Sequence, residues 1–272
     1  MKIFHYAKIL TSKPNSKILR VGGLESSVIN LAKAQAKTHD VVVLNTEKID
    51  NLNIKSIKLF HLKFNLMNIF FNNPFIDLIK FFGKPNMIII HEIYNFNIIP
   101  LIFFSRLNNI NIYICPRGTL SPIALEINRF KKYLYLEIVF RNIVKLTDGF
   151  IALNKGEKFY IKKLFKNYKI YVIPNGINKA NSHLKKNKKT KFKKKILVGF
   201  LGRYDFYIKG LDILLREYAL YLGKSLKKSI KLIFVGEHRI KHGYSSKLII
   251  DRFNKIHKKN SIVISGPFYG KK

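Results

Sequence analysis

The sequence predicts an α/β fold of two domains, each built on a parallel sheet. Short apolar runs alternate with helical patterns along most of the chain, which is typical of strand–helix–strand units. Some runs, such as residues 86–90, are continuously apolar, as expected for strands that are buried on both faces of a parallel sheet. Residues 178–195 are polar and rich in lysine, and they indicate a linker between two such alternations.

The first domain is predicted to follow the order of a doubly wound sheet. A stripe of apolar residues at helical spacing predicts a helix at 26–37, and Ser121 before Pro122 is a typical helix start. Residues 65–82, which contain Pro74, are expected to be partly helical. The other expected elements are strands at 2–7, 41–44, 54–60, 86–90, 110–114, 149–153 and 169–173, and helices at 98–107, 129–145 and 155–165.

The second domain repeats the alternation but is expected to be incomplete. Strands are predicted at 196–201, 231–235 and 261–264, and helices from Gly210 or Leu211 to 223 and at 244–258. Three strands and two helices would leave an unpaired sheet edge with exposed apolar side chains. The predicted division is therefore a first domain at 1–178, a basic linker at 179–195 and an incomplete second domain at 196–272.

The 272 residues are strongly basic, with 51 Lys and Arg against 15 Asp and Glu and a formal net charge of +36. This charge favours anionic partners, although an A/T-rich coding bias would account for part of it. An anionic membrane surface is the favoured partner of this kind, and nucleic acid is not expected to be the main one. For the basic and aromatic helix at 129–145, packing on the sheet is favoured over contact with lipid.

Targeting signals and cysteines point to the cytoplasm. No apolar run is long enough for a transmembrane helix, and the first residues do not form a signal peptide. The single cysteine, Cys115, has no partner for an internal disulfide and is expected to be a small core residue. We expect a cytoplasmic protein, with a peripheral position at the inner membrane face as a further option.

Two cations occupy the connection between the first strand and the first helix of the second domain. Arg203 follows the strand and Lys209 precedes the helix. Ligands of open α/β sheets bind outside the carboxyl ends of the strands, and both side chains suit phosphate. The connection predicts a diphosphate site, with a solvated basic turn as the alternative.

Polar residues also follow strands of the first domain. Gly22 and Gly23 precede the 26–37 helix, where a turn without side chains lets the backbone approach a ligand, unless they are ordinary loop glycines. No G-x-G-x-x-G follows the first strand, so a dinucleotide fingerprint is absent. His91 and Glu92 end one strand, and Arg117 follows the next, which predicts a polar cleft unless the histidine is structural.

Taken in order, these residues resemble glycosyltransferase family 4. The motifs are Gly22-Gly23-x-Glu25, His91, Pro116-Arg117-Gly118, Ile173-Pro174-Asn175-Gly176-Ile177, Gly202-Arg203, Lys209-Gly210-Leu211-Asp212, Val235-Gly236 and Gly266-Pro267. Each is weak alone, and their joint order carries a resemblance that extends over essentially the whole chain. It implies the GT-B fold, with two Rossmann-like domains, and a retaining enzyme that uses nucleotide sugars. The run at 116–122 is similar to members that build bacterial surface polysaccharides, such as lipopolysaccharide or capsule.

The resemblance implies a role for each matching residue. Gly22 and Gly23 would approach the donor diphosphate, and His91 would lie beside the transferred sugar. Arg203 and Lys209 would bind the donor phosphates and stabilise the leaving nucleoside diphosphate, which makes His91, Arg203 and Lys209 the catalytic candidates. Because these cations replace a metal, neither a metal nor another cofactor is expected. Gly236 is a further donor-binding candidate, and the acceptor-side candidates are Glu25, Glu92, Arg117 and Asn175.

The chain departs from the family after its last motif. Members continue into a Glu-x7-Glu segment whose two carboxylates hold the donor sugar and the ribose hydroxyls of the nucleotide. The last glutamate of this sequence is Glu237. We therefore expect a C-terminally truncated hexosyltransferase with severely weakened donor binding and with turnover that is absent or very low. Its function would be transfer of a sugar to a saccharide or lipid-linked acceptor. The alternatives are a non-catalytic basic scaffold on membrane or nucleic acid, and a nucleotide-binding remnant without turnover.

Overall fold

The computed structural model describes residues 1–7, 23–45, 57–65, 73–176, 196–224, 230–237, 240–241, 244–257 and 262–266. The chain divides into two compact units, Met1–Ala180 and Asn181–Lys272, called unit 1 and unit 2 below. The predicted linker at 179–195 lies outside the described residues. Within the described part of the chain, no helix is both long and apolar enough to cross a membrane.

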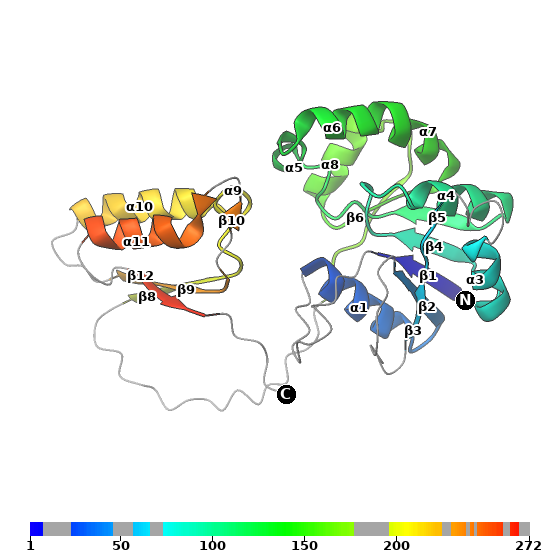
Figure 1. Cartoon of the computed structure of the whole chain (residues 1–272), viewed down its shortest axis with the longest axis horizontal. Coiled ribbons are helices and arrows are strands. Elements are labelled where there is room, and N and C mark those ends of the chain that lie inside the picture. The colour runs from blue at the N-terminus through cyan, green and yellow to red at the C-terminus, as the bar shows by residue number, and fades with distance from the viewer. Residues whose placement is uncertain are drawn as a thin grey trace. The chain divides into compact units, whose positions relative to one another are not determined.

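Unit 1 contains a seven-stranded sheet in the order β3-β2-β1-β4-β5-β6-β7 (Figure 1). All neighbouring strands run parallel, which confirms the predicted α/β architecture. The chain builds outward from β1 to β3 and then returns to the other side of β1 with β4. In such sheets, ligands bind where the strand order reverses, which here is between β1 and β4. The strands are β1 (Lys2–Tyr6), β2 (Asp40–Asn45), β3 (Lys58–His61), β4 (Met87–Ile90), β5 (Asn111–Ile114), β6 (Gly149–Ala152) and β7 (Ile170–Val172).

Helices cover the two faces of this sheet unequally (Figure 1). Helix α1 (Gly23–Gln35) packs Val28 and Ala32 on one face, against Val41 and Val43 of β2. The opposite face carries the main core, to which α3 (Pro74–Phe82), α4 (Ile98–Leu107) and α8 (Lys155–Leu164) contribute. Because side chains alternate along a strand, each strand of unit 1 divides its residues between these two faces.

Two helix starts follow from local sequence. Ser121 caps the short helix α5 (Pro122–Glu126), and its hydroxyl oxygen accepts a hydrogen bond from the Ala124 amide at 3.4 Å. Asn73 caps α3 in the same way, and Pro74 is the first residue of that helix. Proline suits this position because its missing N–H would have no partner there. The mixed segment at 65–82 is thus a regular helix from Pro74 onward.

The predicted single helix at 129–145 is interrupted by wider and tighter turns. It consists of α6 (Arg129–Leu134), a π-helical segment (Tyr135–Phe140), α7 (Arg141–Ile143) and a 3-10 turn (Val144–Leu146). Leu136, Phe140 and Val144 are buried, and their spacing of four residues exceeds the 3.6 residues of an α-helical turn. A π turn takes up this excess, so all three side chains reach the core. Packing on the sheet is therefore confirmed for this side of the segment.

Unit 2 contains a parallel three-stranded sheet in the order β12-β9-β8. Helices α10 (Leu211–Lys224) and α11 (Ser246–Ile256) lie together over one face, where Tyr218, Phe234 and Ile250 form part of the core (Figure 1). The edge strand β8 leaves Ile196 and Leu201 exposed, as predicted for an incomplete sheet. The remaining elements are β8 (Ile196–Leu201), α9 (Phe206–Lys209), β9 (Ile230–Val235), β10 (Ile240–Lys241), β11 (Tyr244–Ser245) and β12 (Ile262–Ser265).

Candidate active site

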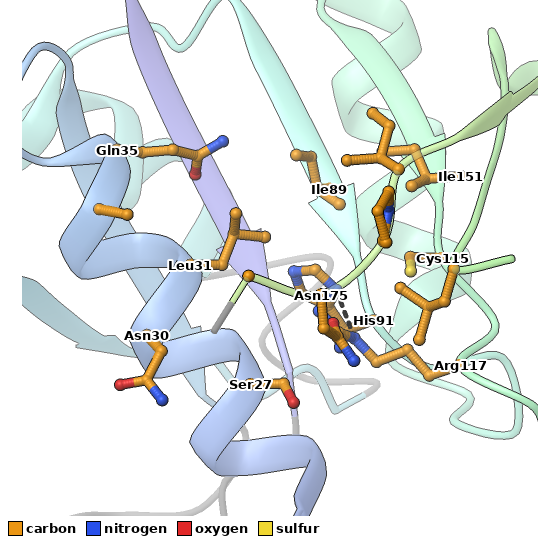
Figure 2. Close-up of a pocket in the computed structure, with 15 residues that line it drawn as sticks. Ser27, Asn30, Leu31, Gln35, Ile89, His91, Cys115, Arg117, Ile151 and Asn175 are labelled. Atoms are coloured by element: carbon orange, nitrogen blue, oxygen red, sulfur yellow. Dashed lines mark hydrogen bonds between the residues drawn. The ribbon is translucent and has the colours of Figure 1, made fainter. Parts of the chain in front are cut away.

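A pocket of about 200 Å³ opens in unit 1 between α1 and the carboxyl ends of the strands (Figure 2). Its floor follows from strand alternation, which puts Ile89 and His91 on the face that α1 covers only in part. Cys115 lies on the same face, and burial raises the pKa of its thiol to about 11, so it is a neutral wall of the pocket. Residues 173–176 complete the lining of the pocket.

Three of the predicted site residues meet in this pocket. Arg117 Nε donates a hydrogen bond to His91 Nδ1 at 3.0 Å, and Arg117 Nη1 donates one to Asn175 Oδ1 at 3.0 Å. Figure 2 shows Arg117 extending from the end of β5 towards His91 and Asn175. Arg117 has a φ of 52°, an uncommon conformation for a residue other than glycine. Such local strain is often found where a side chain must be aimed at a ligand.

His5 joins this group, although the sequence did not indicate it. Its Nδ1 lies 2.9 Å from His91 Nε2, and its Nε2 lies 2.6 Å from Gln35 Oε1. The two imidazole rings stack with centroids 5.2 Å apart. Burial lowers the pKa of His5 to about 4 and holds the pKa of His91 well below its usual range. Both rings are therefore neutral near pH 7. One signal was available, because His5 is a polar residue between Phe4 and Tyr6 in a strand with an apolar centre.

Glu157 holds the turn that carries Arg117. Its buried carboxylate accepts hydrogen bonds from the Gly118 amide at 2.5 Å and from the Leu153 amide at 2.7 Å. The Asn154 side chain, in turn, accepts a bond from the Glu157 amide at 2.8 Å at the start of α8. Sequence reasoning missed this residue, but Asn154 followed three residues later by Glu157 matches a helix-capping pattern.

The other predicted acceptor-side residues lie away from the pocket lining. Glu92 accepts a hydrogen bond from Asn95 Nδ2 at 3.1 Å, and Glu25 lies in the first turn of α1. Glu92 also raises the pKa of Tyr6, after the larger effect of burial, which places its carboxylate near that residue. Gly23 is the exposed first residue of α1, and Gly22 lies outside the described residues.

The predicted phosphate residues belong to unit 2. Arg203 and Lys209 are both exposed, and both lie on the connection between β8 and α10, at the carboxyl edge of the sheet. Gly236 follows β9 at the same edge. A Cβ placed there would lie 1.9 Å from the Gly202 carbonyl oxygen, so only glycine fits. Because the ends of β8 and β9 are in close contact, the connection that carries Arg203 begins beside Gly236.

Comparison with known families shows to which family the chain belongs. The model of Glycosyltransferase Family 4 matches residues 21–181, a range that contains every residue lining the pocket. The chain belongs to glycosyltransferase family 4. This places the pocket of unit 1 inside the part of the chain that defines the family. The comparison with curated proteins found no match.

Solved structures share the fold of this glycosyltransferase at low sequence identity. A lipopolysaccharide outer core galactosyltransferase, WaaB, has a TM-score of 0.62 at 13% identity, over 98% of this chain and 68% of its own. HepE of Anabaena in complex with UDP has a TM-score of 0.68 at 15% identity, over 98% of this chain and 70% of its own. MurG of Acinetobacter baumannii has a TM-score of 0.51 at 12% identity, over 100% of this chain and 68% of its own. These likenesses confirm the GT-B fold class.

Proposed function

We propose that this glycosyltransferase moves a hexose from a nucleoside-diphosphate sugar to a hydroxyl of a saccharide or lipid-linked acceptor, with retention at the anomeric carbon. The acceptor oxygen would bond to the anomeric carbon as the bond to the phosphate oxygen breaks, and the hydroxyl proton would leave with the diphosphate. The observation that carries the proposal is the pocket in which His91, Arg117 and Asn175 form a connected polar wall.

The donor is proposed to bind at the carboxyl edge of unit 2. Arg203 and Lys209 offer two exposed cations there, and Gly236 keeps the neighbouring strand end free of a side chain. Cations positioned at a leaving diphosphate stabilise its developing charge, so the proposal includes no metal and no other cofactor. A relative by fold, HepE, was solved with UDP-glucose, which makes a UDP-sugar the first donor to test.

The acceptor side is proposed to lie in unit 1. The pocket of about 200 Å³ has roughly the volume of six or seven water molecules, and its apolar floor beside a cationic rim suits a sugar ring with its hydroxyls. Arg117 would donate hydrogen bonds to hydroxyl oxygens, and His91 would lie at the floor beside the transferred sugar. Glu25 and Glu92 remain proposed acceptor contacts outside this lining, and Gly22 and Gly23 remain proposed contacts of the donor diphosphate.

The proposed setting is the cytoplasmic face of a bacterial membrane, where a surface polysaccharide is assembled. The 129–145 segment supports this proposal, because the side away from the core exposes apolar and basic residues together. Phe130 is 77% exposed and Ile138 is 61% exposed, and exposed lysines and arginines accompany them. Such a surface suits anionic lipid headgroups.

Filling the pocket should strongly weaken saccharide binding in unit 1. Ala34 is exposed on α1 and lines the pocket, so Ala34→Phe would place a ring in the space proposed for the sugar. Saturation-transfer NMR with a panel of free hexoses and disaccharides should show transfer to at least one saccharide in the wild type. We expect that signal to fall to about one tenth in Ala34→Phe, the decrease that loss of one ordinary hydrogen bond to the saccharide would produce.

The matched control is Lys33→Phe, which adds the same ring to the exposed side of the same helix, outside the pocket lining. It should leave the transfer signal unchanged. Equal signals in both variants, or no transfer from the wild-type protein to any saccharide, would contradict the acceptor site in unit 1.

A further inference from the structure

An unbroken chain of hydrogen-bonded side chains crosses unit 1 from α1 to the segment after β7. It begins at Gln35 at the end of α1, passes through His5 on β1 and His91 after β4, and reaches Arg117 after β5. The successive distances are 2.6 Å from Gln35 Oε1 to His5 Nε2, 2.9 Å from His5 Nδ1 to His91 Nε2, and 3.0 Å from His91 Nδ1 to Arg117 Nε. Arg117 continues the chain to Asn175 at 3.0 Å.

The position of every proton between Gln35 and Arg117 follows from Arg117. A guanidinium can only donate, so Arg117 Nε–H must donate to an unprotonated Nδ1 of His91. A neutral imidazole has one N–H, so the His91 proton is on Nε2 and donates to His5 Nδ1. The His5 proton is then on Nε2 and donates to the Gln35 carbonyl oxygen, which is the amide atom that lies there.

The surroundings favour this neutral arrangement. Both rings are almost completely buried, and the cation of Arg117 opposes a second positive charge nearby. A buried polar network in which each donor meets an acceptor is rigid, because any rotation leaves a polar atom unpaired. Each ring nitrogen of the two histidines has its partner in this chain.

The consequence is a division of roles around the pocket. Both nitrogens of His91 are used within the protein, so its ring offers a ligand only its carbon edge and face in this arrangement. Among the described residues that line the pocket, Arg117 is the charged one, and its guanidinium has five N–H groups. Two of its nitrogens are held by His91 and Asn175, which fixes the plane of the group.

We propose that His5 is a positioning residue for Arg117: by fixing the Nε2–H tautomer of His91, it keeps His91 Nδ1 as an acceptor and so aims the guanidinium at the ligand in the pocket. Gln35 completes the device, because it fixes the tautomer of His5 in turn. The identity of that ligand as a saccharide rests on the proposed function, whereas the proton arrangement does not depend on it.

The tautomers can be measured directly in the ligand-free protein. Long-range proton–nitrogen NMR spectra of the chain labelled with ¹⁵N-histidine distinguish the two neutral tautomers from imidazolium. The wild type should show the Nε2–H tautomer for His5 and His91 near neutral pH. The Arg117 Nε–H signal, recorded with ¹⁵N-arginine, should exchange slowly with water because His91 accepts its hydrogen.

Two variants test the transmission from His5 to Arg117. His5→Phe retains an aromatic ring but removes the acceptor of the His91 proton, so the Arg117 Nε–H should exchange about tenfold faster, the factor that loss of one ordinary hydrogen bond allows. Gln35→Leu changes only the partly exposed end of the hydrogen-bonded chain and should leave His5 as a mixture of its two neutral tautomers. This variant therefore tests the transmission even if His5→Phe does not fold. Asn30→Leu, on α1 in the same pocket lining but outside the chain, should change neither signal.

An Nδ1–H or imidazolium pattern for His91 in the wild type would overturn the proposal. So would an Arg117 exchange rate in folded Gln35→Leu or His5→Phe that equals the wild-type rate, since a merely structural histidine predicts that equality. Saccharide binding is read in a separate saturation-transfer experiment. Its failure would remove the proposed ligand and leave the assignment of His5 as a positioning residue unaffected.

Discussion

Gly236→Ala is expected to unfold or strongly loosen the strand ends of unit 2. The added Cβ would lie 1.9 Å from the Gly202 carbonyl oxygen, and the glycine has a φ of 154°, which side chains disfavour. Relief of this contact requires the ends of β8 and β9 to separate. We expect a loss of about 3 kcal/mol in the free energy of unfolding of unit 2, from strain and overpacking combined.

Hydrogen exchange followed by mass spectrometry would localise this effect. Peptides from β8 and β9 should lose protection in Gly236→Ala, whereas peptides from unit 1 should not. Gly199→Ala is the matched control, because it adds the same methyl group to β8 where no atom lies within 4 Å. Unchanged protection in Gly236→Ala would show that the contact between Gly202 and Gly236 is not a fixed feature of unit 2.

Unit 1 should become markedly less stable as the pH falls below the ordinary pKa of histidine. The folded state keeps His5 neutral down to a pKa of about 4, whereas the unfolded chain takes up the proton near 6.5. Between these two values the unfolded state binds more protons, so acid favours unfolding. From about pH 7.5 to about pH 5, His5 alone should lower the free energy of unfolding by about 2 kcal/mol, and His91 should add to this loss.

Urea titration followed by the methyl NMR signals of Ile88 and Ile90 would measure this dependence, because both residues lie in the core of unit 1. The control is His61→Asn, at an exposed position on β3, which should leave the pH dependence as in the wild type. His5→Phe should make it shallower. A wild-type stability that is equal at both pH values would contradict the buried neutral pair.

Most of the fold could be predicted from the periodicity of the sequence. The helix expected at 98–107 coincides with α4, and the strand expected at 86–90 is β4 with one residue fewer. The apolar runs and helix starts in these segments are strong local signals. The π-helical segment at Tyr135–Phe140 was not predicted, because it arises from the spacing of buried contacts with the sheet rather than from local propensity.

The pocket was predicted in part for a similar reason. His91 and Arg117 follow strands, and the carboxyl ends of parallel strands share one edge, so their proximity follows from the sequence pattern. The contact between His5 and His91 spans 86 residues and depends on the pairing of β1 with β4, which local patterns do not determine. Glu92 adjoins His91 in the sequence, yet it is absent from the pocket lining, because successive residues of an extended chain point in opposite directions.

The central claim is that this family 4 glycosyltransferase binds a nucleotide sugar through Arg203 and Lys209. Calorimetric titration of UDP, GDP and their sugars into the purified chain at near-physiological salt tests it most directly. The account predicts saturable binding of one nucleotide, weakened at least about a hundredfold in Arg203→Ala/Lys209→Ala, because each charge-assisted contact contributes about 1.5–3 kcal/mol.

Arg216→Ala/Lys224→Ala removes the same charge from exposed positions on α10 and should bind the nucleotide as the wild type does. Equal weakening in both double variants, or binding of every polyanion alike, would contradict the claim and favour a basic scaffold that binds anions without a specific site.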